Sequence, residues 1–313
     1  MKRIILSVLS IAILSLFLVQ CSDIKKDTSA GKTADYLFTN AKVYTVNQKQ
    51  PWAEAVAVKG KDIIFVGNTD QALTFKGSET KVIDLNGKML LPGFIDAHAH
   101  PVMAAAYSGS LILDPEAEIK DWISETEKYI KENPNKPYYV AFGFLAAKFG
   151  AEGPKKELLD AVSTKIPVVL IDEGWHSAWV NSKALELAGI DKNTPDPIPG
   201  KHFYKRDQKG NPTGWCLENN SFAPILKKLK IVSADNIVLK SKELFDLFSS
   251  VGITGFYDAG MTGFEDEGYS ALQKLESSGK LPFRITGSYG IQSKTQLKDA
   301  VEKLRDLNKK FSS

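Results

Sequence analysis

Two histidines, His98 and His100, stand two residues apart at the end of an apolar run that begins at Leu90. Side chains of a β-strand alternate between its two faces, so both imidazoles point to the same side of the chain. Neutral imidazole is a common ligand for zinc and similar ions. The spacing therefore predicts that His98 and His100 bind one divalent metal ion, with two partly exposed strand-end histidines as the structural alternative.

A metal ion bound by imidazoles can support hydrolysis. It lowers the pKa of a bound water toward neutrality and polarises the bond to be cut. A catalytic zinc site normally takes three protein ligands and one water, so two histidines do not complete it. The chain has four histidines, and the other two are His176 and His202. No imidazole ligand can come from the residues after His202.

The residues around the pair carry a family resemblance. Residues 92–100 read Pro-Gly-Phe-Ile-Asp-Ala-His-Ala-His, which resembles the first barrel strand of the amidohydrolase superfamily. Residues 166–185, 210–218 and 252–260 resemble its amidohydrolase 3, or YtcJ-like, branch. The resemblance extends over nearly everything after residue 35.

This resemblance implies an α/β fold: part of a (β/α)₈ TIM-type barrel, preceded by a small β-sandwich module. It also implies a hydrolase that cuts C–N bonds of amide, N-formyl or cyclic amide groups with metal-activated water. The metal is expected to be zinc, with one or two ions in the full-length protein. Family members add a carboxylated lysine or a glutamate, two further histidines and an aspartate that takes the proton.

Those additional ligands and the general-base aspartate are expected beyond Ser313. We therefore expect this chain to be the N-terminal part of a longer enzyme, and to be inactive alone. The alternative is a noncatalytic envelope lipoprotein, or a degenerate amidohydrolase-like binding protein.

Four further residues are candidates for the site. Asp96 precedes the pair on the same strand face and could orient an imidazole or cap the strand end. His176 could line a substrate pocket or bond a loop carbonyl, and Glu218 could face the pocket or the dipole of a helix. Asp258 ends a strand, where barrel chemistry collects, although it could equally cap the next turn.

The first residues resemble a bacterial lipoprotein signal. Lys2 and Arg3 precede an apolar run to Val19, and Cys21 follows as the expected lipidation site. An uncleaved N-terminal anchor is the alternative. The sequence thus predicts a lipid-anchored protein of the bacterial cell envelope, with membrane contact through the anchor.

The expected organisation is a signal peptide (1–21), a flexible linker (22–34), a small β module that is an incomplete composite β-sandwich (35–91), and the N-terminal part of the barrel with an insertion (92–313). Barrel strands are expected near residues 94, 140, 169, 255 and 285. If residues 101–250 form an insertion, only three strands remain. Helices are expected over 114–131, 234–251, 267–278 and 295–311.

Composition limits the partners. A net charge of +3 over 313 residues is too small to favour nucleic acid binding. We expect a small-molecule substrate, and a homo-oligomer is compatible with the sequence.

Overall fold

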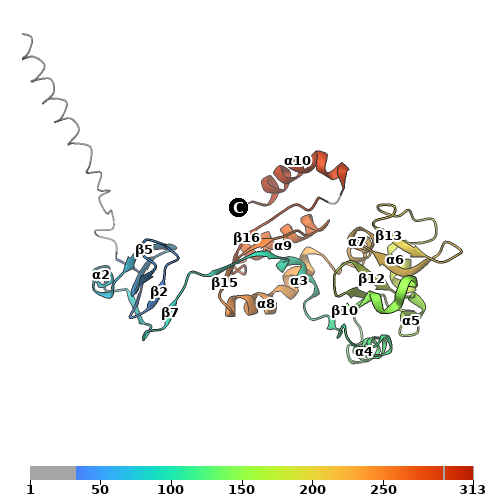
Figure 1. The fold of residues 1–313 in the computed structure, drawn as a ribbon, viewed down its shortest axis with the longest axis horizontal. Helices are drawn as coiled ribbons and strands as arrows, with labels where there is room; N and C mark the ends of the chain where they lie inside the picture. The colour runs from blue at the N-terminus through green and yellow to red at the C-terminus, as the bar shows by residue number, and fades with distance from the viewer. Residues whose placement is uncertain (1–32, 292, 313) are drawn as a thin grey trace, which may run out of the picture. The chain divides into compact units, whose positions relative to one another are not determined.

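The computed structural model describes residues 33–291 and 293–312 (Figure 1). The chain divides into two compact units, one ending at Pro92 and the other beginning at Gly93. The expected signal peptide, Cys21 and most of the expected linker lie outside the described residues. Within the described ranges, none of the helices has the length and apolar character needed to cross a bilayer.

The first unit consists of two small sheets and one short helix. One sheet has the strand order β5-β4-β1-β6 and the other β3-β2-β7. Leu37, Ala55, Ala57 and Ala72 form the buried core of the larger sheet. The elements of the first unit are β1 (Tyr36–Thr39), β2 (Lys42–Tyr44), β3 (Trp52–Ala53), β4 (Ala55–Lys59), β5 (Asp62–Gly67), α2 (Thr69–Leu73), β6 (Lys81–Asp84) and β7 (Met89–Leu90).

The second unit contains a three-stranded sheet with the order β16-β15-β8. Its strands are β8 (Phe94–Ala99), β15 (Ile253–Asp258) and β16 (Arg284–Thr286), and both pairings are parallel. The expected strands near residues 140 and 169 belong to another sheet, so the five expected strands do not lie in one sheet. Buried apolar side chains of α3, α8 and α9 pack with this sheet in one core.

Residues between β8 and β15 build a six-stranded sheet with the order β13-β14-β12-β11-β10-β9. The sheet combines two kinds of pairing: β9, β10 and β11 run parallel, while β12, β13 and β14 pair antiparallel. This sheet is therefore mixed. Its strands are β9 (Leu111–Ile112), β10 (Tyr139–Phe144), β11 (Val168–Asp172), β12 (Ser177–Val180), β13 (Phe203–Arg206) and β14 (Pro212–Leu217).

Helices surround both sheets of the second unit (Figure 1). The helix expected from residue 114 begins instead at Ile119, because Glu118 and Asp121 form a capping box there. Asp114 accepts the backbone N–H of Glu116 in a turn. The helices are α3 (Pro101–Tyr107), α4 (Ile119–Glu132), the 3₁₀ helix η1 (Ala146–Glu152), α5 (Lys156–Asp160), α6 (Ser182–Ala188), α7 (Asn219–Lys228), α8 (Ala234–Ser250), α9 (Glu265–Ser277) and α10 (Lys294–Phe311).

Candidate active site

The two histidines lie where β8 ends and α3 begins. β8 pairs in parallel with β15, which aligns Ala99 with Asp258. The rings of His98 and His100 lie 5.7 Å apart between centroids, with their planes at 89°. The expected placement of both imidazoles on one side of the strand end agrees with this proximity.

The ring of His100 is fixed by a backbone carbonyl. Its Nδ1 lies 2.9 Å from the carbonyl oxygen of Gly260. A carbonyl oxygen only accepts, so this contact requires the hydrogen on Nδ1 and leaves the Nε2 lone pair for a ligand. Gly260 adopts φ +128°, which a residue with a Cβ rarely does. Its backbone N–H donates to Asp258 Oδ1 over 3.0 Å, so Asp258 holds the turn that presents the carbonyl.

Asp258 is completely buried. Within the described part of the chain, its Oδ2 has no hydrogen-bond partner. Burial raises the pKa of this carboxyl group, an effect that the Gly260 N–H and the nearby His100 partly oppose. Asp258 therefore caps the turn after its strand. Its expected role in the chemistry of a barrel strand end stays a prediction.

The Asp96 side chain forms a hydrogen bond with the backbone. Its Oδ1 accepts the N–H of His98 over 2.9 Å. This is the strand-end role, and the contact that orients an imidazole comes from Gly260 instead.

His176 and Glu218 form a pair between the two antiparallel strands β12 and β14. His176 Nδ1 lies 3.1 Å from Glu218 Oε2, and the backbone N–H of Glu218 donates to the carbonyl oxygen of His176 over 2.7 Å. The imidazole side chain is 73% exposed. The hydrogen bond and the charge of Glu218 raise the pKa of His176, and Asp172 adds a smaller effect in the same direction.

Glu218 of this pair and Trp175 beside it have unusual backbone conformations. Glu218 adopts φ 65° and ψ 153°, a region that is essentially restricted to glycine. Trp175 adopts φ 61°. Such conformations cost about 1–3 kcal/mol each and persist where the surroundings enforce them, which occurs often at functional sites.

A cavity of about 510 Å³ lies next to the histidine pair. Asp96 and His100 form part of its wall, while His98, His176, Glu218 and Asp258 are not among its lining residues. Trp175 and Asn219, which adjoin His176 and Glu218 in the sequence, do line the cavity. The His176–Glu218 pair therefore lies next to the cavity without lining it. The apolar wall of the cavity comes from α3, α7, α8, β15 and the loop after β15.

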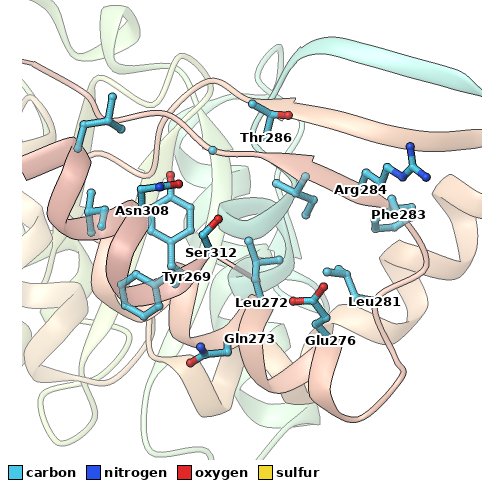
Figure 2. Close-up of a pocket in the computed structure, with 15 residues that line it drawn as sticks. Tyr269, Leu272, Gln273, Glu276, Leu281, Phe283, Arg284, Thr286, Asn308 and Ser312 are labelled. Carbon is cyan, nitrogen blue, oxygen red and sulfur yellow. The ribbon is translucent and has the colours of Figure 1, made fainter. Parts of the chain in front are cut away.

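A second cavity, of about 470 Å³, lies between α9, β16 and α10. Figure 2 shows Tyr269, Asn308 and Ser312 on one side of it, and Leu281, Phe283 and Arg284 on the other. None of the candidate residues from the sequence lines this cavity.

The remaining histidine has a structural role. His202 is buried, and its Nδ1 accepts the backbone N–H of Asn220 in the first turn of α7 over 3.2 Å. Cys216 is buried in the sheet, and burial raises the pKa of its thiol to about 12.

Sequence reasoning did not identify Gly260, Tyr107 or Trp175. A backbone carbonyl carries no sequence signal, although an aspartate two residues before a glycine is typical of a turn. The two aromatic residues come from elements far apart in the chain, so only the fold shows that they meet.

The histidine pair fits a divalent ion, because one imidazole is already oriented and a buried carboxylate oxygen without a partner lies in the same strand-end region. Among residues 33–291 and 293–312, no group of three His, Cys, Asp or Glu side chains is arranged to hold a metal. Metal binding by His98 and His100 therefore stays a prediction.

Known proteins resemble this chain over most of its length. The Exoenzymes regulatory protein AepA of Pectobacterium carotovorum subsp. carotovorum is 34% identical over 283 residues, which cover 89% of this chain and 60% of that protein. The N-substituted formamide deformylase of Arthrobacter pascens is 30% identical over 262 residues, which cover 82% of this chain and 47% of that enzyme. The chain therefore spans about half to three fifths of the length of these relatives.

A solved structure has the same fold. A metal-dependent hydrolase from Pyrococcus horikoshii OT3 matches with a TM-score of 0.61 at 20% identity, over 86% of this chain and 50% of that one. The sequence model of the amidohydrolase family matches residues 81–311, which include the histidine pair, Asp258 and every residue that lines the cavity beside His100. The chain belongs to the amidohydrolase family.

Proposed function

We propose that this protein is a metal-dependent hydrolase that cuts the C–N bond of an amide, N-formyl or cyclic amide group in a small molecule. The observation that carries the proposal is the His98–His100 pair at a strand end, with the Nδ1 of His100 already committed to Gly260 and a cavity adjoining it. Membership of the amidohydrolase family supports the reaction class.

In this proposal, His98 and His100 hold a divalent ion, most simply zinc, through imidazole nitrogens. A bound ion supplies the Lewis acidity that makes a water nucleophilic at neutral pH and polarises the amide carbonyl. Gly260 keeps the His100 ring in the orientation that exposes Nε2, and Asp258 holds Gly260 in place. The cavity binds the substituent of the substrate and excludes water from it.

We also propose that β8, β15 and β16 are strands of a (β/α)₈ barrel, and that residues 35–91 are part of a composite β-sandwich. The parallel pairing of the three strands and the fold shared with the Pyrococcus protein support the barrel. In this view the histidine pair lies at the carboxyl end of a barrel strand, where catalytic residues of such barrels gather.

The 313 residues alone are proposed to be inactive. Two histidines provide fewer ligands than a catalytic zinc site normally takes. The support is the ligand count in the described residues and the length of the relatives.

The metal claim can be tested by calorimetric titration of the purified chain with Zn²⁺. His98→Ala and His100→Ala should each weaken binding about 10-fold or more, because each removes a ligand nitrogen. His202→Asn is the matched control and should bind zinc as the unaltered chain does. Undiminished zinc affinity in both alanine variants would remove the basis of the proposal.

The hydrolase claim needs the protein isolated from its own cells with its bound metal. Activity toward a panel of N-acyl amines should disappear on chelation and return with Zn²⁺. Tight metal binding without turnover of any amide would favour the second candidate, a noncatalytic envelope lipoprotein or binding protein. The incomplete ligand set in the described residues is the observation in favour of that candidate.

The proposed location is the bacterial cell envelope, with lipid attached to Cys21. Cys21→Ser should abolish incorporation of labelled fatty acid and release the protein from the membrane fraction. Equal labelling of both forms would exclude lipidation at this residue.

A further inference from the structure

One face of α3 connects the candidate metal ligand with the loop that carries Trp175. His100 is the N-cap of α3, and its carbonyl oxygen accepts the N–H of Ala104 over 2.9 Å. The lining residues Met103, Ala104 and Tyr107 follow three, four and seven positions after it, so they share one face of the helix. The ring of Tyr107 meets the indole of Trp175 edge to face, with centroids 4.7 Å apart. The cavity therefore extends from His100 along α3 to Trp175.

Several apolar lining residues remain partly exposed, so a bound ligand can contact them. They are Ala99, Met103, Ala104, Trp175, Phe248 and Ile253. Other rings support two of these side chains from behind. Trp175 packs against Tyr107 and also against Phe142, whose centroid lies 5.0 Å away. Phe248 packs against the buried Phe256 at 5.1 Å. The accessible wall thus consists of indole, phenyl, thioether and aliphatic surface that is already held in place.

The loop that carries Trp175 is fixed at several points. Asp172 Oδ1 accepts the backbone N–H of Ser177 over 2.6 Å, and the carbonyl oxygen of Asp172 accepts the N–H of Trp175 over 3.1 Å. The bond from Glu218 N–H to His176 O attaches the loop to the start of α7. These contacts hold Trp175 in its left-handed conformation against the cavity, so the position of the indole is set before a ligand binds.

The same lining gives a carboxylate no cationic partner. Its polar side chains are those of Asp96, His100, Asn219 and Thr262, together with Tyr107, whose hydroxyl is buried. None of these described lining residues is a lysine or an arginine. A carboxylate placed against Trp175 would therefore lose hydration without gaining a counter-charge, which is costly. A hydrocarbon group placed there gains free energy by leaving water.

We propose that this cavity selects amides whose substituent is an uncharged hydrocarbon ring on a short alkyl spacer, such as a 2-phenylethyl group, and that Trp175 recognises the ring. The proposal rests on the hydrolase function proposed above and names its substrate class. One turn of helix rises about 5.4 Å. A ring between Met103 and Trp175 therefore needs a spacer to reach an amide at His100. The volume of about 510 Å³ falls in the range of small-molecule sites.

Binding to the metal-free chain tests the proposal. Calorimetry compares three amides: N-(2-phenylethyl)acetamide, N-ethylacetamide, which lacks the ring, and N-[2-(4-carboxyphenyl)ethyl]acetamide, which adds a carboxylate to the ring. We expect the phenylethyl amide to bind about 10-fold or more tightly than each of the other two. Equal affinity of either comparison amide would overturn the proposal, as would the absence of measurable binding by the phenylethyl amide.

Trp175→Leu tests the recognition of the ring. It should weaken binding of the phenylethyl amide about 3- to 10-fold, because the ring loses its aromatic contact. Binding of N-ethylacetamide should not change. The matched control is Trp52→Leu, which removes a half-exposed indole on β3 that does not line the cavity. It should leave all three affinities unchanged. Equal effects of the two substitutions would show that Trp175 does not contact the ring.

Met103→Lys tests the wall with every aromatic ring in place. Met103 is partly exposed, so a lysine there can keep its ammonium group in water or place it against a bound carboxylate. The preference for the phenylethyl amide over the carboxyphenyl amide should fall about 10-fold, because the carboxylate gains a charged partner. Leu239→Lys adds the same charge on an exposed face of α8 and should leave the preference unchanged. An unchanged preference in Met103→Lys would overturn the proposed position of the ring.

These measurements contain no metal and no turnover. A chain that prefers the phenylethyl amide but loses no zinc affinity in His98→Ala and His100→Ala would retain the ring site and refute the hydrolase. The opposite pattern would leave the metal site intact and refute the substrate class.

Discussion

The Nδ1 of His100 lies 2.9 Å from the backbone carbonyl oxygen of Gly260, which ties the end of β8 to the loop after β15. This contact fixes the tautomer and the direction of the ring before any ion binds. Partners of this kind commonly change metal affinity 10- to 100-fold when they are lost.

Gly260→Ala should therefore weaken zinc binding by about 10-fold or more, because alanine disfavours φ +128° and the carbonyl would turn away from the imidazole. Calorimetric titration with Zn²⁺ measures the effect. Gly210→Ala is the matched control, since Gly210 has φ +82° in a hairpin turn with open space around its Cβ position. That variant should lose stability but keep its zinc affinity. Equal zinc affinity in both variants would show that Gly260 does not position His100.

A glycine at position 218 should give a more stable chain than an alanine there. Its φ of 65° and ψ of 153° are essentially glycine-only, so Glu218→Gly relieves strain, whereas Glu218→Ala keeps the Cβ and the strain. Glycine also has more conformational entropy in the unfolded chain, which offsets part of this gain. We expect the free energy of unfolding of Glu218→Gly to exceed that of Glu218→Ala by about 1 kcal/mol. Urea denaturation measures both. If the two variants unfold at the same urea concentration, the backbone at this position is not strained.

Leu170 and Leu239 offer a matched pair for the core. Leu170 on β11 is fully buried among Trp179, Phe144 and other apolar side chains, whereas Leu239 on α8 is 79% exposed. Leu170→Ala should lower the free energy of unfolding by about 2.7–5 kcal/mol through lost burial and the cavity left behind. Leu239→Ala should change it by less than about 0.5 kcal/mol. Chemical denaturation of both variants checks the difference, and similar losses would mean that Leu239 is covered in solution.

The local parts of this site could be predicted from the sequence. Strand alternation is enough to put His98 and His100 on one side, and capping residues and apolar periodicity located α8 and α10 to within one or two residues. The start of α4 was misplaced, because Asp114 and Glu118 both suit a helix start and only the capping box with Asp121 decides between them.

The contacts between residues far apart in the sequence could not be predicted from the sequence. Nothing local indicates that β10 and β11 join β12 and β14 rather than β8, since all are short apolar strands. The Gly260 carbonyl and the indole of Trp175 reach the site only through that topology. The contact between His176 and Glu218 likewise follows from the antiparallel register of β12 and β14.

The His176–Glu218 pair should give the protein a defined pH response. Glu218 raises the pKa of His176 in the folded chain, so the protonated imidazole stabilises the fold. That contribution is fully present below the unfolded pKa of about 6.5 and is lost as pH rises through the higher folded pKa. Because the pair is exposed, it should contribute less than about 1 kcal/mol.

Glu218→Gln should lower the pKa of His176 toward its ordinary value, because the hydrogen bond to a charged acceptor and its field are both removed. A titration of the imidazole followed by NMR measures the change directly. The variant should unfold more readily than the original chain at about pH 5.5, and the difference should shrink by about pH 9. Glu186→Gln, which removes a carboxylate paired with Lys183 on the surface of α6, is the control and should leave the His176 titration unchanged. A Glu218→Gln chain whose His176 titrates as before would show that the two side chains do not pair in solution.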